Sequence, residues 1–246
     1  QHRTVVVQES SEDALGLALW ALAYAIHAKF ELARTQKLYD QLRDMGVPES
    51  KYVRPHAYSL IANTLVGNDT AAKRDQDHII DRYRSDIHWF EESLRYANGV
   101  IPYALLIQCQ RNPNDNLLKI AKESLEMLDN QQRIGSIPAP VGNRVWHMLG
   151  QQTQDVYGQQ PIDAAFMAMA WSVLADITGL AEYGKKAEYW MGWFYGHNIW
   201  QQPFADLTDG SCLDGIDEHG PSENYGAEST IMYLWAALTV RNRVQH

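Results

Sequence analysis

The sequence is poor in several features that would point to particular classes of protein. It holds two cysteines, Cys109 and Cys212, which are too few for a disulfide framework and lack the spacing of a zinc site. No apolar run reaches the ~20 residues that a membrane-spanning helix requires. Lys and Arg number 21 against 30 Asp and Glu, and the formal charge of -9 argues against a nucleic-acid backbone as partner. We therefore expect a soluble protein, cytoplasmic by default, that does not bind nucleic acid and does not span a membrane.

Signatures of several common chemistries are also missing. The chain has no HExxH, P-loop, GxGxxG or GxSxG motif, and no His has a second His four residues later or a Cys at ligand spacing. A calcium-binding EF-hand loop begun at Asp206 has Ser211 where glycine belongs, and one begun at Asp209 has Asp214 there. The sequence therefore predicts no metal and no cofactor.

Helical periodicity dominates what is present. Nine segments carry it, namely residues 14–30, 33–45, 56–66, 70–83, 101–110, 116–128, 161–177, 181–195 and 228–240. No stretch keeps strand-like alternation over five residues, so little sheet is expected. In two helix pairs the first helix is the more apolar, which is typical of an inner helix buried all round beside an outer helix that is wet on one face. We predict an all-α fold, an (α/α) toroid of antiparallel hairpins forming one domain over residues 1–246. A full six-hairpin ring needs more helices, so we expect either an incomplete ring or further hairpins before Gln1.

Three connections are longer than those that compact domains usually use, and such loops tend to be functional. They cover residues 86–99, 135–160 and 198–224. Carboxylates crowd the last of them, just before a helix that has Glu228 in its first turn, and they are Asp209, Asp214, Asp217 and Glu218. A helix start capped by Ser222 or Asn224 would explain Glu228 but not this crowding.

Two carboxylates facing one glycosidic bond, one protonated and one ionised, are what hydrolysis of a sugar linkage requires. We assign Glu228 as the acid and Asp214 or Asp13 as the base, because crowded like charges raise the pKa of at least one of them. N-capping of the first helix is the more ordinary interpretation of Asp13. Further candidates are polar or aromatic side chains suited to sugar hydroxyls or to stacking on sugar rings, although each would serve a polar loop or a core equally well. They are Gln159, Gln160, Asp163, Asn224, Asn98, Glu12, Trp89 and Tyr225.

Four segments resemble the motifs of one family. They are SEDALGLALWAL (residues 11–22), YANGVIPYAL (96–105), YGQQPIDAA (157–165), and GSCLDGI (210–216) followed by NYGAEST (224–230). In this order they are similar to the SEDxxGRALWALG, YDNARLPxAL, FDQQPIEAA and GGCxDGL/NxGAEST patterns of bacterial helical domains found alone or behind a family-4 glycosyltransferase module. The (α/α)-barrel architecture of that family resembles that of glycoside hydrolases and sugar epimerases. The resemblance extends from about Gln8 to Ala237.

The chain departs from the family pattern at several charged positions. Ala97 and Gly158 replace acidic residues, and Val100 and Leu17 replace arginines. A further family motif, GYCxDDNAR, would precede Glu9 and is not present. The resemblance implies an oligosaccharide or glycan as ligand, and it leaves two alternatives. The chain is either an enzyme acting on a glycosidic bond or a catalytically weakened glycan-binding module that serves a glycosyltransferase. A protein-binding helical scaffold is a third possibility, and it predicts exposed apolar patches.

Overall fold

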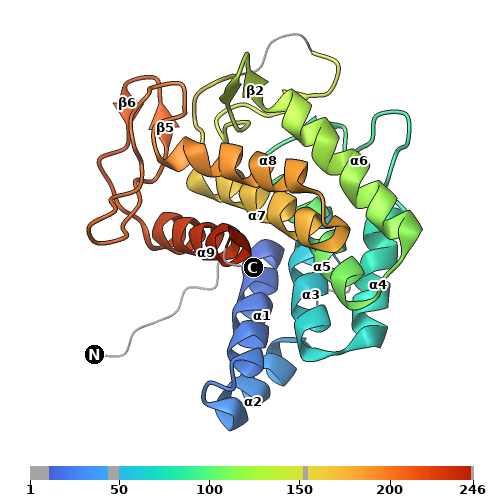
Figure 1. The fold of residues 1–246 in the computed structure, drawn as a ribbon. Helices are drawn as coiled ribbons and strands as arrows, with labels where there is room; N and C mark the ends of the chain where they lie inside the picture. The colour runs from blue at the N-terminus through green and yellow to red at the C-terminus, as the bar shows by residue number, and fades with distance from the viewer. Residues whose placement is uncertain (1–10, 44–49, 152–154, 245–246) are drawn as a thin grey trace. The chain divides into compact units, whose positions relative to one another are not determined.

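The computed structural model describes residues 11–43, 50–151 and 155–244 (Figure 1). The chain divides into two compact units, residues 1–82 and 83–246. The single domain expected from the sequence stays a prediction.

Helices are the main regular structure of both units. The first unit holds α1 (Glu12–His27), α2 (Leu32–Arg43), α3 (Val53–Val66) and α4 (Asp69–Ile80). The second holds α5 (Val100–Arg111), α6 (Asp115–Gln131), α7 (Pro161–Thr178), α8 (Ala181–Met191) and α9 (Ala227–Val244). Each helical segment expected from periodicity overlaps one of these helices, so the all-α prediction is confirmed.

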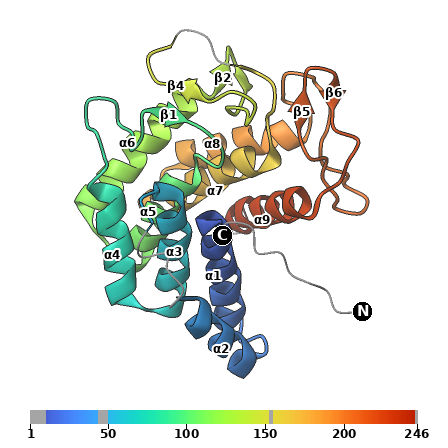
Figure 2. The same cartoon turned by 180° about the vertical axis from the view of Figure 1, so that it is seen from behind.

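The strands are two residues long and pair as three antiparallel ribbons in the second unit (Figure 2). They are β1 (Ser93–Leu94) with β4 (His147–Met148), β2 (Arg133–Ile134) with β3 (Ile137–Pro138), and β5 (Ile216–Asp217) with β6 (Gly220–Pro221). These short ribbons connect loops to one another and do not form a layer of the core.

Local sequence signals explain several helix ends. The Ser11 hydroxyl accepts from the Ala14 N–H at 3.3 Å, so Ser11 is the N-cap of α1. Asn68 caps α4 in the same way. Gly67 and Gly179 end α3 and α7 with φ of 76° and 71°, in the left-handed region that glycine adopts at least cost.

The first unit is built around α3, which is buried along almost its whole length and packs against α1 and α4. A polar network lies inside this packing. His56 Nδ1 lies 2.9 Å from Asp75 Oδ1, and His56 Nε2 lies 3.0 Å from the Ser50 carbonyl oxygen. Both ring nitrogens of His56 are thus held by buried partners. The second Asp75 oxygen accepts from Ser59 Oγ at 2.6 Å and from Asn63 Nδ2 at 3.0 Å.

A second histidine beside this network gives the first unit a dependence on pH. His78 stacks on His56 with ring centroids 3.6 Å apart. Burial, aided by the charge of His56, lowers the pKa of His78 to about 4. The unfolded chain therefore takes up a proton near the usual pKa of ~6.5, whereas the folded chain stays neutral until about pH 4.

We expect the stability of the protein to fall as the pH is lowered through this window and His78→Gln to flatten that fall. Urea unfolding midpoints at about pH 7 and about pH 5 would measure it, with His219→Gln, at an exposed position, as the control. An equal fall in wild type and His78→Gln would contradict the assignment.

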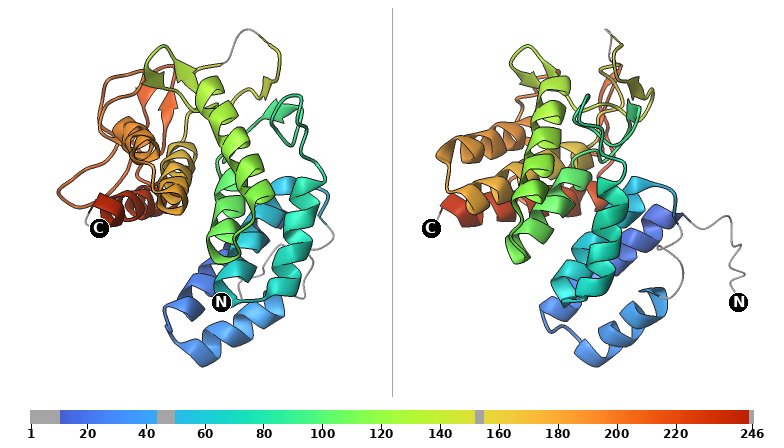
Figure 3. Two further views of the ribbon diagram at one scale, coloured as in Figure 1. Left: turned by 45° about the vertical axis from the view of Figure 1, so that its right-hand side comes forward. Right: turned by 90° about the vertical axis from the view of Figure 1, so that its right-hand side faces the viewer.

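The second unit is centred on α7, which packs against α5, α8 and α9 (Figure 3). Residues 161–175 are buried. Among the described residues α7 alone is long and apolar enough to cross a membrane, but 83% of it is buried inside the protein, as in the core helix of a soluble protein. The hairpins α5–α6 and α7–α8 each pair an inner, buried helix with an amphipathic one. The sequence predicts this pattern for residues 161–195 and also for residues 14–45. In the latter pair it does not hold, because the buried residues of α1 are only Gly16, Leu19, Trp20 and Ala23.

Candidate functional site

The three long loops of the second unit lead into the N-termini of α5, α7 and α9, and they are tied to one another. The β1–β4 ribbon joins the first loop to the second, with Leu94 opposite His147. The second and third loops meet at a bridge between Gln159 and Ile216, where the Ile216 N–H donates to the Gln159 carbonyl at 2.9 Å. We call the surface formed by residues 93–99, 142–149, 155–160 and 213–228 the loop face.

Glycines permit the close approach of these loops. A Cβ atom on Gly142 would lie 1.8 Å from the Tyr157 carbonyl oxygen, and one on Gly215 would lie 2.3 Å from the Gln159 carbonyl oxygen. Neither position can carry a side chain without moving the backbone opposite. The loop face therefore depends on glycine at its crossing points.

Asp214 fastens the third loop to the start of α9. Its Oδ1 accepts from the Gly226 N–H at 2.6 Å and from Ser229 Oγ at 2.8 Å. Its Oδ2 accepts from the side-chain amide of Asn224. Asp214 is thus the acceptor for the first turn of α9, the role that capping by Ser222 or Asn224 would otherwise fill. The Ser222 hydroxyl instead accepts from the Asn224 N–H at 3.2 Å.

These contacts determine the charge state of Asp214. Partial burial alone would raise its pKa, but the hydrogen bonds from Ser229, Asn224 and Gly226 outweigh burial and hold the pKa below its usual value. The carboxylate is therefore ionised at neutral pH, and in this state it can act as a base or stabilise a positive charge. It cannot serve as a proton donor.

The lowered pKa of Asp214 predicts an acid-sensitive contact. A depressed folded-state pKa contributes stability above the unfolded value of ~3.9, and this contribution is lost as the pH falls through the folded value. We expect Asp214→Asn to increase hydrogen exchange at the Gly226 amide at neutral pH and to match the wild type once the pH is below the folded-state pKa of Asp214. Asp217→Asn, at an exposed position, is the control. A difference that persists in acid would contradict this origin.

A second set of side chains lies buried where the loops enter α5 and α7. Gln159 is fully buried, accepts from Trp193 Nε1 at 2.9 Å and donates to the Val156 carbonyl at 2.8 Å. Asn98 is fully buried and accepts from the Arg95 N–H at 2.9 Å through its side chain. Asp163 is 2% exposed and accepts from the Asn98 N–H at 3.3 Å. These side chains hold the loops in place from beneath the surface.

The departures from the family motifs fit this backbone. Ala97 and Val100 are fully buried, so charged side chains there would be removed from water. Gly158 has φ of 77°, and a Cβ on it would lie 2.9 Å from Asn143 Oδ1. An acidic residue at this position would be strained, because residues with a side chain seldom adopt the left-handed region.

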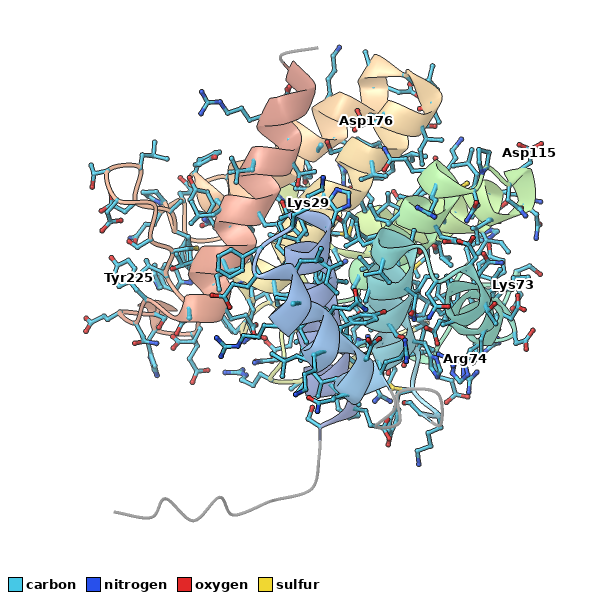
Figure 4. All side chains as sticks on the ribbon, turned by 90° about the horizontal axis from the view of Figure 1, so that it is seen from below. Lys29, Lys73, Arg74, Asp115, Asp176 and Tyr225 are labelled. Atoms are coloured by element: carbon cyan, nitrogen blue, oxygen red, sulfur yellow. The ribbon has the colours of Figure 1, made fainter. Side chains whose placement is uncertain are left out.

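Other predicted site residues differ in accessibility. Glu228 is exposed in the first turn of α9, Tyr225 beside it is 55% exposed (Figure 4), and Gln160 is half-buried at the start of α7. Trp89 is fully buried and packs edge-on against Phe90, with ring centroids 5.4 Å apart. The indole of Trp89 is thus part of the core and does not face the solvent.

Asp13 and Glu12 begin α1 in the first unit, where Glu12 accepts from the Ser50 hydroxyl. The sequence-based grouping of Asp13 with Asp214 and Glu228 stays a prediction.

The loop face carries two arginines whose contacts sequence reasoning missed. Arg144 donates to Asp155 at 3.1 Å and to Glu218 at 2.8 Å, which connects the second and third loops. The Arg95 guanidinium lies 4.1 Å from the ring centre of Trp146, whose ring is half exposed. Single arginines in polar loops form no recognisable sequence motif, so their contacts could not be predicted. The length of the loops was the one signal that pointed to these segments.

Within the described ranges, no three His, Cys, Asp or Glu side chains gather closely enough to hold a metal ion. The absence of a cofactor stays a prediction from the sequence.

Comparison with known proteins shows the fold. No protein-family model matches the chain, and no curated protein sequence matches it. Among solved structures, a D-mannose isomerase superposes with a TM-score of 0.67 at 14% identity, covering 95% of this chain and 70% of that chain. The GH76 α-mannanase of Bacteroides thetaiotaomicron superposes at 0.66 with 9% identity, covering 96% and 69%. The unsaturated glucuronyl hydrolase of Bacillus sp. GL1 superposes at 0.64 with 12% identity, covering 98% and 70%.

These three structures have the (α/α)-barrel fold, and the chain shares that fold class with them. The prediction from the helical hairpins is confirmed. At such identities the likeness shows the fold alone.

Proposed function

We propose that this chain is a carbohydrate-active protein that acts on a glycosidic bond at the loop face. The observation that carries the proposal is the joining of three long loops at the N-termini of α5, α7 and α9, which gathers polar, acidic and aromatic side chains on one surface. The three structural neighbours support a sugar ligand, since their names describe an isomerase of mannose, a mannanase and a hydrolase that degrades glycosaminoglycan.

The proposed chemistry uses two carboxyl groups at the start of α9. Asp214 is held ionised by its three donors and serves as base or nucleophile. Glu228 serves as the acid. Gly226 and Ser229, which lie on either side of Glu228 in the chain, both contact Asp214, so the two carboxyl groups belong to the same helix start. Tyr225 and Trp146 are half exposed and suit stacking on sugar rings.

A second candidate is a glycan-binding module that serves a glycosyltransferase partner. One observation favours it. The side chains of Gln159, Asn98 and Asp214 already accept hydrogen bonds from other groups of the protein, which leaves them fewer free atoms for catalysis. Under this alternative the loop face binds a glycan but does not cleave it.

An oligosaccharide panel separates these proposals. Reducing-sugar release would be followed for each oligosaccharide, and binding would be measured by calorimetry. Release from at least one member supports the enzyme, whereas saturable binding without release supports the module. Neither release nor binding anywhere in the panel would refute both.

A further inference from the structure

Charge is divided unequally along the segments of the loop face. The segments that the β1–β4 ribbon joins, residues 93–99 and 142–149, contain two arginines and no Asp or Glu. The other segments, residues 155–160 and 213–228, contain no Lys or Arg. They hold the carboxyl groups of the loop face, which are Asp155, Asp214, Asp217, Glu218, Glu223 and Glu228. The loop face therefore has a basic part at the β1–β4 ribbon and an acidic part that leads into α9.

The two arginines of the basic part differ in their partners. Arg144 donates to Asp155 and Glu218, so two carboxylates already balance its charge. Arg95 is partly buried, and its Nε donates to Ser93 Oγ at 3.3 Å. Its two terminal amino groups donate to no group in the part of the chain that the structure describes, and no carboxylate there pairs with it. In a protein with a formal charge of -9, this guanidinium keeps two donor groups available.

Contacts with Asn98 and Trp146 hold Arg95 in place. The side chain of Asn98, which is fully buried, accepts from the Arg95 N–H at 2.9 Å and donates to the Arg95 carbonyl oxygen at 3.1 Å. The guanidinium lies 4.1 Å from the ring centre of Trp146. The pairing of Leu94 with His147 places these two side chains opposite each other across the ribbon. A side chain held in this way loses little further freedom when it binds a ligand.

We propose that Arg95 binds the carboxylate of an acidic sugar, so that the glycan bound at the loop face contains uronic acid. A guanidinium presents paired N–H donors that match the two oxygens of a carboxylate, and stacking on an aromatic ring uses its plane and not these donors. Trp146 is half exposed, so its ring keeps surface for the apolar face of a sugar. The inference rests on the proposed function, because it names the class of glycan that the same site takes.

A purely structural role of Arg95 makes a different prediction. If the contact between Arg95 and Trp146 only supports the ribbon, removing the guanidinium loosens the loops and weakens the binding of acidic and neutral glycans alike. If Arg95 binds a carboxylate, its removal weakens the binding of acidic glycans alone. The ratio of the two affinities within one variant therefore separates the two roles.

Calorimetry with matched oligosaccharides measures this ratio. The probes are oligomers of glucuronic acid and of galacturonic acid, each compared with its carboxyl-reduced, neutral form. They would be titrated into the wild type, Arg95→Gln, Arg95→Lys and Arg241→Gln. Arg241 is exposed on α9, well past its first turn, so Arg241→Gln makes the same change of charge away from the loop face.

We expect the wild type to bind at least one acidic oligomer about tenfold or more tightly than its neutral form. Arg95→Gln should abolish this preference and keep the affinity for the neutral form. Arg95→Lys should retain only part of it, because an ammonium group lacks paired donors. Arg241→Gln should retain all of it.

Several results would overturn the inference. They are equal affinity for acidic and neutral forms in the wild type, a preference that survives in Arg95→Gln, and a preference lost equally in Arg241→Gln. Binding of neutral oligosaccharides alone would also overturn it and would leave the proposed function in place. Binding of no oligosaccharide, acidic or neutral, would refute both.

Discussion

Glu228→Gln is expected to slow cleavage by about 100-fold or more, the usual effect of removing a general acid. The substrate is an oligosaccharide of the panel that the wild-type protein cleaves. Gln preserves the size of the side chain and cannot donate a proton to the leaving group. Because Glu228 is exposed, the substitution removes no buried contact, and stability should stay within ~0.5 kcal/mol of the wild type. Initial rates of reducing-sugar release and calorimetric affinity would be measured on the same preparations.

Glu182→Gln provides a close control for that experiment. Glu182 also lies exposed in the first turn of a helix, α8, but that helix does not start at the loop face. Its substitution should leave cleavage unchanged. Full activity in Glu228→Gln would remove Glu228 from the proposed mechanism, and lost affinity at an unchanged turnover would make it a binding residue.

The second large effect is expected in the first unit, where Asp75→Ala should lower the free energy of unfolding by about 3–5 kcal/mol. Asp75 is fully buried, and its Oδ1 lies 2.9 Å from Nδ1 of the buried His56 ring. Its removal takes away the buried partner of His56 Nδ1, the acceptor of Ser59 Oγ and one of the two acceptors of Asn63 Nδ2. Chemical denaturation followed by circular dichroism would measure the change.

Asp77→Ala is the matched control on the same helix. Asp77 pairs with Lys73 at the surface, and such exposed pairs contribute ~0–1 kcal/mol. If Asp75→Ala were no more damaging than Asp77→Ala, the stabilising role assigned to this buried network would be wrong. The joint effect of Asp75→Ala and His56→Ala should be smaller than the sum of the single effects, because the two side chains form one network.

The helices were predictable because their signals are local. Capping residues such as Ser11 and Asn68, and glycines such as Gly67 and Gly179, mark helix ends within a few residues of sequence. The contrast between apolar inner and amphipathic outer helices identified the hairpins. The buried pair of His56 and Asp75 could not be predicted, because it joins two helices at positions that carry no recognisable motif.

The sequence predicted which loops form the candidate site, but it predicted only some of the roles of their residues. The loop before α9 was singled out by its carboxylates, yet the use of Asp214 as an acceptor for the start of α9 depends on Gly226 and Ser229, which lie 12 and 15 residues away. Trp89 looked like a sugar platform beside acidic residues, but it is buried. Composition does not reveal whether an aromatic side chain in a loop points into the core or toward the solvent.

Amide hydrogen exchange with and without a bound oligosaccharide tests most directly whether the loop face is the sugar site. The ligand would be the panel member with the highest affinity, and Glu228→Gln would be used to prevent turnover. The account predicts slower exchange in residues 93–99, 142–149, 155–160 and 213–226, with α6 unchanged. Unchanged exchange in all these loops, together with protection elsewhere in the protein, would contradict it.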